Sequence, residues 1–581
     1  MTDAGSGRSP SSPDADVYAD PEDADRYAAS TYVPVAYGNL QLAPVDETAP
    51  DPGTGGRFRL LDLPTVPKLR HLVGPSAIML GASLGSGETL FWPGLIARHG
   101  WALYWAFWVG VLTQFVINTE IQRWTLATGE SIFRGFDRVH RAWPLFLLAF
   151  GFLSLGWPGW AASAAQVGAS GLGLGSLDVA AFGGEFAGWR AFGIVLMVLI
   201  WLTYQLTPLM YNVVERIQLM LVSVTTVLAL VLFVVARPLG ELGGVPAGAV
   251  SFGTLPPTGE IAAFLGGMAF AGAGGYLNLS QSLWVREKGY AMGRYQGRVK
   301  NPLIGDEPEP VERDGFAIRP TRTNFRRWRA WWLVARLEHF LTFVVGLLVV
   351  STLLMAVAAA YAGGSDAGAL TMWLGVVVPA LGRFGGTLVY LVLFVALFTT
   401  EYAIVESFVR NSADVVYETY GRDAGWRLPR IFWTLLTVFS LWGILVLSLP
   451  IPIEEPFGLL VLNAALSGLM MWPYSVLTVL INTARLPEHV QPSWFRIVAM
   501  WWASGIFGYL SVLLLGLTLQ TDFGLAAFRT EMTVVGSAPG GYLLWAVFFG
   551  VQAYAVVRTV RAKRRAQGTV EDAEEARGRI P

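Results

Sequence analysis

Long apolar runs separated by short polar segments occupy most of the chain. A helix needs about 20 apolar residues to cross the roughly 30 Å hydrocarbon core of a bilayer. A shorter run at 369–381 is predicted to be an interfacial helix instead. About twelve runs are long enough to span, at approximately 73–97, 101–126, 144–168, 189–207, 213–236, 260–285, 333–361, 385–408, 430–450, 457–481, 496–519 and 541–560. The pattern predicts an all-α integral membrane protein.

Two of the predicted spans are interrupted by small residues. The first span contains GASLGSGE at 81–88, and the sixth contains GGMAFAGAGGYLN at 266–278. Glycine lets the backbone leave helical geometry, and secondary transporters with two inverted repeats often place such breaks around a site near the membrane midplane. The separation of five helices therefore predicts two inverted repeats of five helices, facing each other across a cavity, followed by two further helices. Close helix packing is the alternative explanation for a single glycine cluster.

Charged residues orient the spans and divide the chain. Lys and Arg gather in the loops of one side, which the positive-inside rule assigns to the cytoplasm. We therefore expect a multi-pass plasma-membrane protein with both termini in the cytoplasm. The predicted segments are a disordered cytoplasmic tail (1–70), the first repeat (71–240), the second repeat (256–485), helices eleven and twelve (494–560) and a charged cytoplasmic tail (561–581). A polar cytoplasmic insertion at 286–332 is expected to be solvated and partly disordered.

Composition narrows the classes of function. With 54% hydrophobic and 14% charged residues, the chain is too apolar for a soluble core, and its net charge of −1 points to no nucleic-acid partner. The absence of cysteine excludes disulfides and thiolate metal sites. The sequence contains no phosphate-binding loop, no HExxH and no GxSxG in a plausible context. We therefore expect neither an enzyme nor an ATP-driven pump, and no cofactor.

Glu88 is a carboxylate in the middle of the first glycine cluster. It lies about 20 Å along a helix that enters from the cytoplasm, where a charge is costly unless it is paired, protonated or hydrated. Glu88 is therefore predicted to bind substrate and to carry protons. Glu401 is the second candidate proton carrier, nearer the cytoplasmic end of its helix. A neutral Glu88 that bonds to another helix is the structural alternative.

Other charged groups are predicted to have structural roles. Glu406 is expected to pair with Arg410, four residues later, at the membrane interface. His339 and its neighbours are expected to anchor a helix at the cytoplasmic surface. Glu215 is expected to interact with the positive end of its own helix.

The sequence resembles the Nramp family of divalent-metal transporters over most of residues 70 to 520. The resemblance is carried by VGPSAIMLGASLGSGETLFWPGLIARHGW (73–101), EIQRWTLATGES (120–131), YNVVERIQLMLV (211–222), LNLSQSLWVREKG (277–289) and VLTVLINTARLPEHV (476–490). It implies a LeuT-type fold of two inverted five-helix repeats plus two helices. It also implies proton-coupled import of a divalent cation.

The chain departs from this family at the motifs that supply metal ligands. The helix-one motif Asp-Pro-Gly-Asn aligns with residues 85–88, so the aspartate is absent, and the helix-six motif Met-Pro-His aligns with residues 274–276, so the thioether is absent. One carboxylate among neutral oxygens favours an Mg²⁺-like or hydrated ion over Mn²⁺ or Fe²⁺. The candidate substrate ligands are Glu88, which would also be the metal ligand, with Gly85, Ser86, Gly274, Tyr276, Asn278 and Gln281.

Two other functions stay open. Gly274, Gly275 and Tyr276 leave space where the family has bulky ligands, which suits a small organic solute such as an amino acid or amine. A non-transporting membrane sensor or scaffold would have lost the site, and the retention of Glu88 argues against it. The expected partners are the transported ion or solute, protons and membrane lipids.

Overall fold

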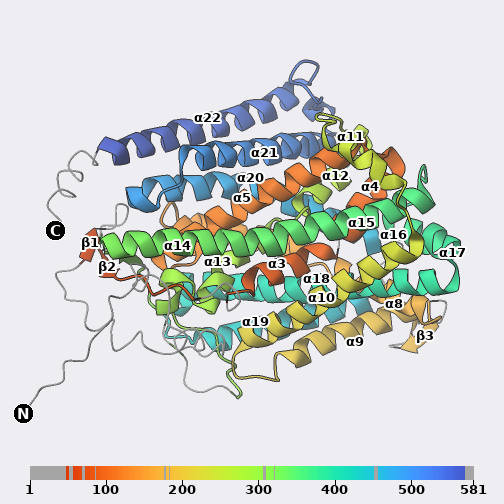
Figure 1. The fold of residues 1–581 in the computed structure, drawn as a ribbon, viewed down its shortest axis with the longest axis horizontal. Helices are drawn as coiled ribbons and strands as arrows, with labels where there is room; N and C mark the ends of the chain where they lie inside the picture. The colour runs from red at the N-terminus through yellow and green to blue at the C-terminus, as the bar shows by residue number, and fades with distance from the viewer. Residues whose placement is uncertain are drawn as a thin grey trace, which may run out of the picture.

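The computed structural model describes residues 48–50, 57–67, 72–85, 87–175, 178–181, 184–304, 309, 311–319, 321–449 and 456–568. In this part of the chain, long helices run side by side in one bundle (Figure 1). Nine helical segments of the described residues are long and apolar enough to cross a bilayer. The protein is therefore a multi-pass membrane protein.

All twelve predicted spans correspond to helical segments. Three fall outside the nine candidates: helices one and six, which are broken, and α9 (Gly188–Thr203), which has 16 residues. The others are α5 (Tyr104–Thr128), α7 (Ala142–Leu155) with α8 (Gly159–Gly171), α10 (Met210–Ala236), α14 (Arg322–His339) with α15 (Val345–Ala362), α18 (Gly382–Val416), α19 (Leu428–Ser448), α20 (Pro456–Ala484), α21 (Trp494–Thr521) and α22 (Pro539–Gly568).

Helix one is broken where its glycine cluster predicts. Its first half, α3 (Pro75–Leu84), starts with a proline, which suits the first turn of a helix because its missing N–H has no helical partner there. After Gly85 the chain continues as a short π-helix, η2 (Gly87–Phe91), and then as α4 (Trp92–His99). The predicted interruption of helix one near Gly85 is confirmed.

Helix six is broken in the corresponding place of the second repeat. Its halves are α12 (Ile261–Ala269) and α13 (Tyr276–Lys288). Between them, Gly272 has φ 141° and Gly275 has φ 69°, conformations that glycine adopts without a steric penalty. The predicted interruption of helix six is confirmed.

Short elements fill the connections. The run predicted to be interfacial forms α16 (Ala369–Thr371), η8 (Met372–Val377) and α17 (Val378–Ala380). Strands β1 (Thr48–Pro50), β2 (Arg57–Leu61) and β5 (Phe316–Ile318) form a small sheet in the order β1-β2-β5, and β3 (Asp178–Ala181) pairs with β4 (Gly184–Ala187). The remaining short helices are α6 (Ile132–Asp137), α11 (Val245–Ala249), η3 (Trp101–Leu103), η4 (Glu241–Gly244), η5 (Thr258–Glu260), η6 (Ala291–Tyr295), η7 (Phe340–Val344), η9 (Tyr417–Gly421), η10 (Glu488–Val490) and η11 (Ala526–Phe528).

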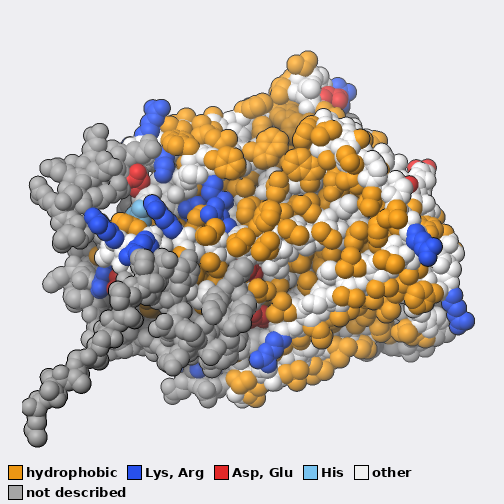
Figure 2. Space-filling model, viewed as in Figure 1, with side chains coloured by type: hydrophobic (Ala, Val, Ile, Leu, Met, Phe, Trp, Pro, Cys, Tyr) orange, Lys and Arg blue, Asp and Glu red, His pale blue; other side chains and the backbone are white. Residues whose placement is uncertain are grey.

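Apolar side chains cover the outside of the bundle as well as its core. Figure 2 shows a broad hydrophobic surface along the helices, with Lys and Arg gathered towards one end. That end holds β1, β2 and the last turns of α22 (Figure 1), and we call it the basic end. Helical bundles that lie in a bilayer have such a surface, with apolar side chains along the flank and basic residues at one end.

Two segments are more ordered than the sequence suggested. Residues 57–67, which we expected to belong to the disordered tail, contribute β2 and the buried Leu61 and Leu63. The insertion at 286–332 contains η6, β5 and the start of α14, with Tyr290 and Phe316 buried. The expectation of a solvated insertion was wrong for these residues, because apolar side chains scattered among the polar ones pack on the bundle. Residues 1–47 lie outside the described residues.

Candidate functional site

The two helix breaks contact each other inside the bundle. The backbone N–H of Gly272 donates to Glu88 Oε1 at 3.2 Å. A Cβ at Gly87 would overlap the carbonyl oxygen of Phe270, so only glycine allows the two backbones to come this close. We expected the breaks to face each other across a cavity, but here they are in direct contact.

Glu88 is fully buried, and one of its carboxylate oxygens has no partner. Oε1 accepts the hydrogen bond from Gly272, whereas Oε2 has no hydrogen-bond partner among the described residues. The hydroxyl of the adjacent Thr89 is also buried and, within the same residues, has no partner. An isolated buried carboxylate is very costly unless it takes up a proton or binds a cation. The site is therefore chemically suited to exchange a proton for a cation.

Helix α18 supports the break in helix one. Thr400 Oγ1 accepts a hydrogen bond from the N–H of Gly85 at 2.8 Å and donates to the carbonyl oxygen of Gly81 at 3.1 Å. The hydroxyl thus gives additional hydrogen bonds to backbone groups at the break. Gly85, a predicted site residue, contributes its backbone to the framework of the break.

Amide side chains surround the break in helix six. Gln114 on α5 donates to the carbonyl oxygens of Met268 and Ala269, which lie at the end of α12. Asn278 on α13 donates to Gln114 Oε1 at 2.8 Å and to Asn118, and it accepts from the hydroxyl of Tyr474. These bonds connect α13 to α5 and α20. Asn278, a predicted site residue, therefore lies in a polar layer beside the break.

Gln281 belongs to the same face of α13. It is fully buried, and neither amide atom of its side chain has a hydrogen-bond partner among the described residues. Gln114 and Asn118 were not identified from the sequence as part of this layer. The available signal was the spacing of four residues between Gln114, Asn118 and Gln122, which places three amides on one helical face.

Gly274 and Tyr276 leave no open space. A Cβ on Gly274 would overlap the carbonyl oxygen of Ala269. The ring of Tyr276 packs between those of Phe133 and Phe408, with centroids 5.6 and 6.0 Å away. The small residues serve close backbone packing, so the expectation of vacant volume at these positions was wrong for this conformation. Ser86, the remaining predicted ligand, lies outside the described residues.

Glu401 caps a helix rather than joining Glu88. Its Oε2 accepts a hydrogen bond from the backbone N–H of Ala161 at 3.1 Å, in the first turn of α8. Helix N-termini present unpaired N–H groups and partial positive charge, both of which stabilise a carboxylate. Its neighbour Thr400 contacts Gly81 and Gly85, which come before Glu88 on helix one. The position of Glu401 nearer the cytoplasmic end than Glu88 stays a prediction.

The predicted pair of Glu406 and Arg410 is present, but it is buried inside the bundle instead of lying at the interface. Arg410 also binds Glu287 Oε1 at 2.7 Å, which joins α18 to α13. Glu215 pairs with Lys288 on α13, not with the end of its own helix. These pairs tie the second half of helix six to its neighbours.

His339 and Glu338 are fully buried and contact helix one. His339 Nδ1 lies 2.8 Å from Ser76 Oγ, and the same hydroxyl donates to Glu338. The expectation of a surface anchor was wrong, since the two side chains face α3 and not the membrane surface. They hold the first half of helix one against α14.

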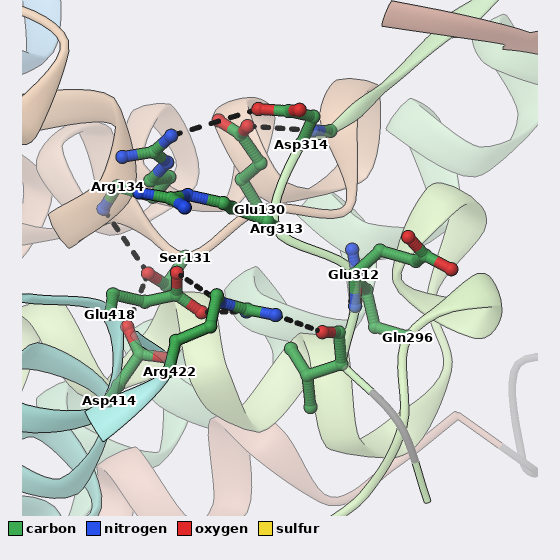
Figure 3. A network of polar contacts seen from close by, with 12 residues as sticks. Glu130, Ser131, Arg134, Gln296, Glu312, Arg313, Asp314, Asp414, Glu418 and Arg422 are labelled. Atoms are coloured by element: carbon green, nitrogen blue, oxygen red, sulfur yellow. Dashed lines mark hydrogen bonds and ion pairs between the residues drawn. The ribbon is translucent and has the colours of Figure 1, made fainter. Parts of the chain in front are cut away.

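A polar network at the basic end fixes the insertion to the bundle (Figure 3). Glu130, just after α5, accepts from the N–H of Gly315 at 2.8 Å and pairs with Arg138. Arg422 donates to the carbonyl oxygen of Val311 at 2.8 Å. These contacts explain why residues around 311–316 are ordered.

Among the described residues, carboxylates and histidines do not cluster into a metal centre. Within the part of the chain that the structure describes, no group of three or more His, Cys, Asp or Glu side chains could hold an ion. Among the described residues, the Glu88 carboxylate accepts its hydrogen bond from the backbone N–H of Gly272.

Among solved structures, this structure is similar to membrane transporters. The structure is similar to a manganese transporter of Eremococcus coleocola in complex with an aromatic bis-isothiourea compound, with TM-score 0.57, 12% identity and coverage of 86% of this chain and 95% of that chain. A mutant of the same transporter gives TM-score 0.56, 12% identity and coverage of 88% and 98%. No protein-family model and no curated protein matches the sequence.

The fold is therefore that of the Nramp-type transporters, with the LeuT-type arrangement of two inverted repeats and two additional helices. This confirms the resemblance found in the sequence at the level of the fold. The structural neighbours are membrane transporters and not enzymes.

Proposed function

We propose that this protein is a secondary active transporter that couples uptake of a divalent cation to protons. The observation that carries the proposal is the unpaired Oε2 of Glu88, buried where the two helix breaks meet. A single carboxylate that alternates between a proton and a cation couples their movements across the membrane. We propose that the protein lies in the plasma membrane with both termini in the cytoplasm, because the positive-inside rule favours a cytoplasmic position for the basic end.

We propose a hydrated, Mg²⁺-like ion as the cation, in preference to Mn²⁺ or Fe²⁺. Mg²⁺ usually binds one or two carboxylates and keeps several of its waters. Imidazole and thioether ligands, which favour softer metals, do not accompany Glu88 among its described contacts. We expect Mn²⁺ to bind weakly, and micromolar Mn²⁺ affinity in calorimetry that excess Mg²⁺ does not reduce would contradict this preference.

A small organic amine is the second candidate substrate. The rings of Trp160 and Phe270 pack with centroids 5.3 Å apart, and Phe270 lies in the break of helix six against Gly87. Aromatic faces attract organic cations, and a carboxylate completes such a site. Glu88 would then neutralise the ammonium group.

Uptake into liposomes separates these substrates. Purified protein should accumulate Mg²⁺ under a proton gradient, and more slowly without one, in a panel that also contains Mn²⁺, amino acids and simple amines. Amine uptake without Mg²⁺ uptake would select the second candidate. No uptake of any member would favour the sensor or scaffold.

Replacement of Glu88 tests its assigned role. Glu88→Gln keeps the size of the side chain and fixes it neutral, so gradient-driven uptake should fall at least about tenfold, the effect of losing roughly 1.4 kcal/mol of charge interaction. Glu401→Gln is the matched control, because its amide oxygen still accepts from Ala161. If Glu88→Gln takes up substrate like the parent and Glu401→Gln shows no uptake, the proton-coupling residue is Glu401 on α18 and not Glu88.

A further inference from the structure

A large cavity opens at the basic end, away from the helix breaks. Its volume is about 880 Å³, and it lies between the end of α20, the turn η10, strand β5 and the last turns of α22. None of the residues that form the contact between the two breaks lines it. This cavity is therefore a separate feature from the transport site.

Arginines dominate the charge of this cavity. Arg485 follows α20, and Arg558, Arg561 and Arg565 come from α22 at spacings of three and four residues, which puts them on one helical face. The lining, as far as the structure describes it, has Glu488 as its acidic residue. Four arginines against one carboxylate make the cavity electropositive and attractive to anions.

The arginines of α22 are available to a ligand. Arg558, Arg561 and Arg565 are exposed and form no ion pair with a carboxylate of the described residues. The wall around them is held in place, since Lys563 on α22 donates to Gln491 Oε1 at 3.2 Å and Arg485 donates to the carbonyl oxygen of Arg138. A wall held by these contacts, with three guanidinium groups that have no carboxylate partner among the described residues, suits the planar, bidentate binding of a phosphate.

The position of the cavity favours a lipid as the source of the phosphate. Helix α22 lies on the outside of the bundle (Figure 1), and apolar side chains such as Leu543, Val547 and Phe549 are more than half exposed along it. The arginine turns follow this apolar stretch, where the membrane-facing part of the helix ends. Basic pockets at the cytoplasmic ends of membrane helices bind anionic headgroups.

We propose that this cavity binds the phosphate group of an anionic phospholipid headgroup. The guanidinium groups of Arg558, Arg561 and Arg565 would contact the phosphate oxygens, and Arg485 would close the opposite wall. Free phosphate offers the same chemistry, so the experiment has to separate the two sources.

Lipid binding by the full-length protein tests the proposal. Protein in nanodiscs of phosphatidylcholine, with or without phosphatidylglycerol, is compared by thermal unfolding, and lipid affinity is measured by native mass spectrometry. Arg561→Gln should weaken phosphatidylglycerol binding about fivefold and reduce its stabilising effect. Arg564→Gln removes the same charge from an exposed neighbour that does not line the cavity, and it should bind like the parent.

The possible outcomes distinguish a lipid headgroup from free phosphate as the ligand. Inorganic phosphate that stabilises the parent but not Arg561→Gln, with no effect of phosphatidylglycerol, would identify free phosphate as the ligand and overturn the lipid assignment. Equal losses in the Arg561 and Arg564 variants, or no loss in either, would overturn the site itself. Arg561→Lys keeps the charge but loses the planar fork, so its binding should lie between that of Arg561→Gln and that of the parent, and binding no better than that of Arg561→Gln would contradict a contribution of charge at this position.

Discussion

The contact between the two helix breaks is set at single residues. At Gly87 a side chain would meet the backbone of Phe270, and at Gly272 the backbone N–H itself binds Glu88. Backbone atoms cannot move aside as a flexible side chain can. The position of the Glu88 carboxylate therefore depends on Gly87, which has no side chain that could bind a substrate or a proton.

Substitution of Gly87 tests this dependence. Gly87→Ala should push the two breaks apart, lower the midpoint of thermal unfolding and abolish uptake, although it leaves Glu88 in place. The measurement is thermal unfolding in detergent together with liposome uptake. Gly505→Ala is the control, because a Cβ there meets open space on α21, and alanine in a helix should stabilise by roughly 0.5–1 kcal/mol. Normal uptake by Gly87→Ala would contradict the close approach.

At the scale of elements, each half of helix one is bound to a different partner. The second half, α4, is tied to the first half of helix six, since Trp92 Nε1 donates to the carbonyl oxygen of Gly267 at 2.9 Å. The first half, α3, contacts α14 through Ser76 and His339. The break at Gly85 thus separates two pieces that can follow different neighbours.

An ion pair at the far end of the bundle reinforces the pairing of α4 with helix six. Glu260, in the turn η5 before α12, binds Arg98 at 3.0 Å and His99 at 2.9 Å. Burial opposes the charge on Glu260, but the hydrogen bonds from His99 and Arg98 prevail and lower the pKa of this carboxyl below its ordinary value. Folding therefore favours the deprotonated form. The stability that Glu260 contributes is present above its unfolded pKa and is lost as the pH falls through its folded pKa.

Replacement of Glu260 tests this pH dependence. As the pH falls from about 5 to about 3, the midpoint of unfolding of the parent should fall more steeply than that of Glu260→Gln, which cannot gain a proton at this position. The exposed pair of Glu531 and Arg529 is the control, since surface pairs of this kind contribute little. Identical slopes for the parent and Glu260→Gln would show that the pair does not hold the two half-helices together.

At the scale of the whole molecule, hydropathy and glycine clusters predicted the twelve helical segments and both breaks, because these depend on local composition. They did not predict the partners of the breaks. Thr400 lies 315 positions from Gly85, and Ala161 lies 240 positions from Glu401. Such contacts depend on how helices pack, which periodicity within one helix does not encode. The ordered structure within the insertion at 286–332 was not predicted, for the same reason.

The absence of cysteine from the chain allows a test of motion across the molecule. Cysteines at Ser76 and His339 would be the sole thiols, placed where α3 contacts α14. A short thiol cross-linker should stop uptake, and reduction should restore it, if α3 must leave α14 during transport. The control pair replaces Ser504 and Gln552, which are in contact on α21 and α22, and its cross-linking should leave uptake unchanged. Full uptake by the cross-linked Ser76 and His339 pair would show that this contact persists throughout the cycle.

The small sheet at the basic end also limits how far such an opening can go. Strand β2 pairs with β5, and the next residues stay with α14, since Leu63 N–H binds Asn324 and Trp331 binds the carbonyl oxygen of Pro64. From Val66, which is buried, to Pro75 the backbone makes nine residue steps, with a contour length of at most about 30 Å. Helix one is therefore tethered to α14 by a short stretch of chain, and the length of this stretch is an upper bound on how far the start of α3 could move from α14.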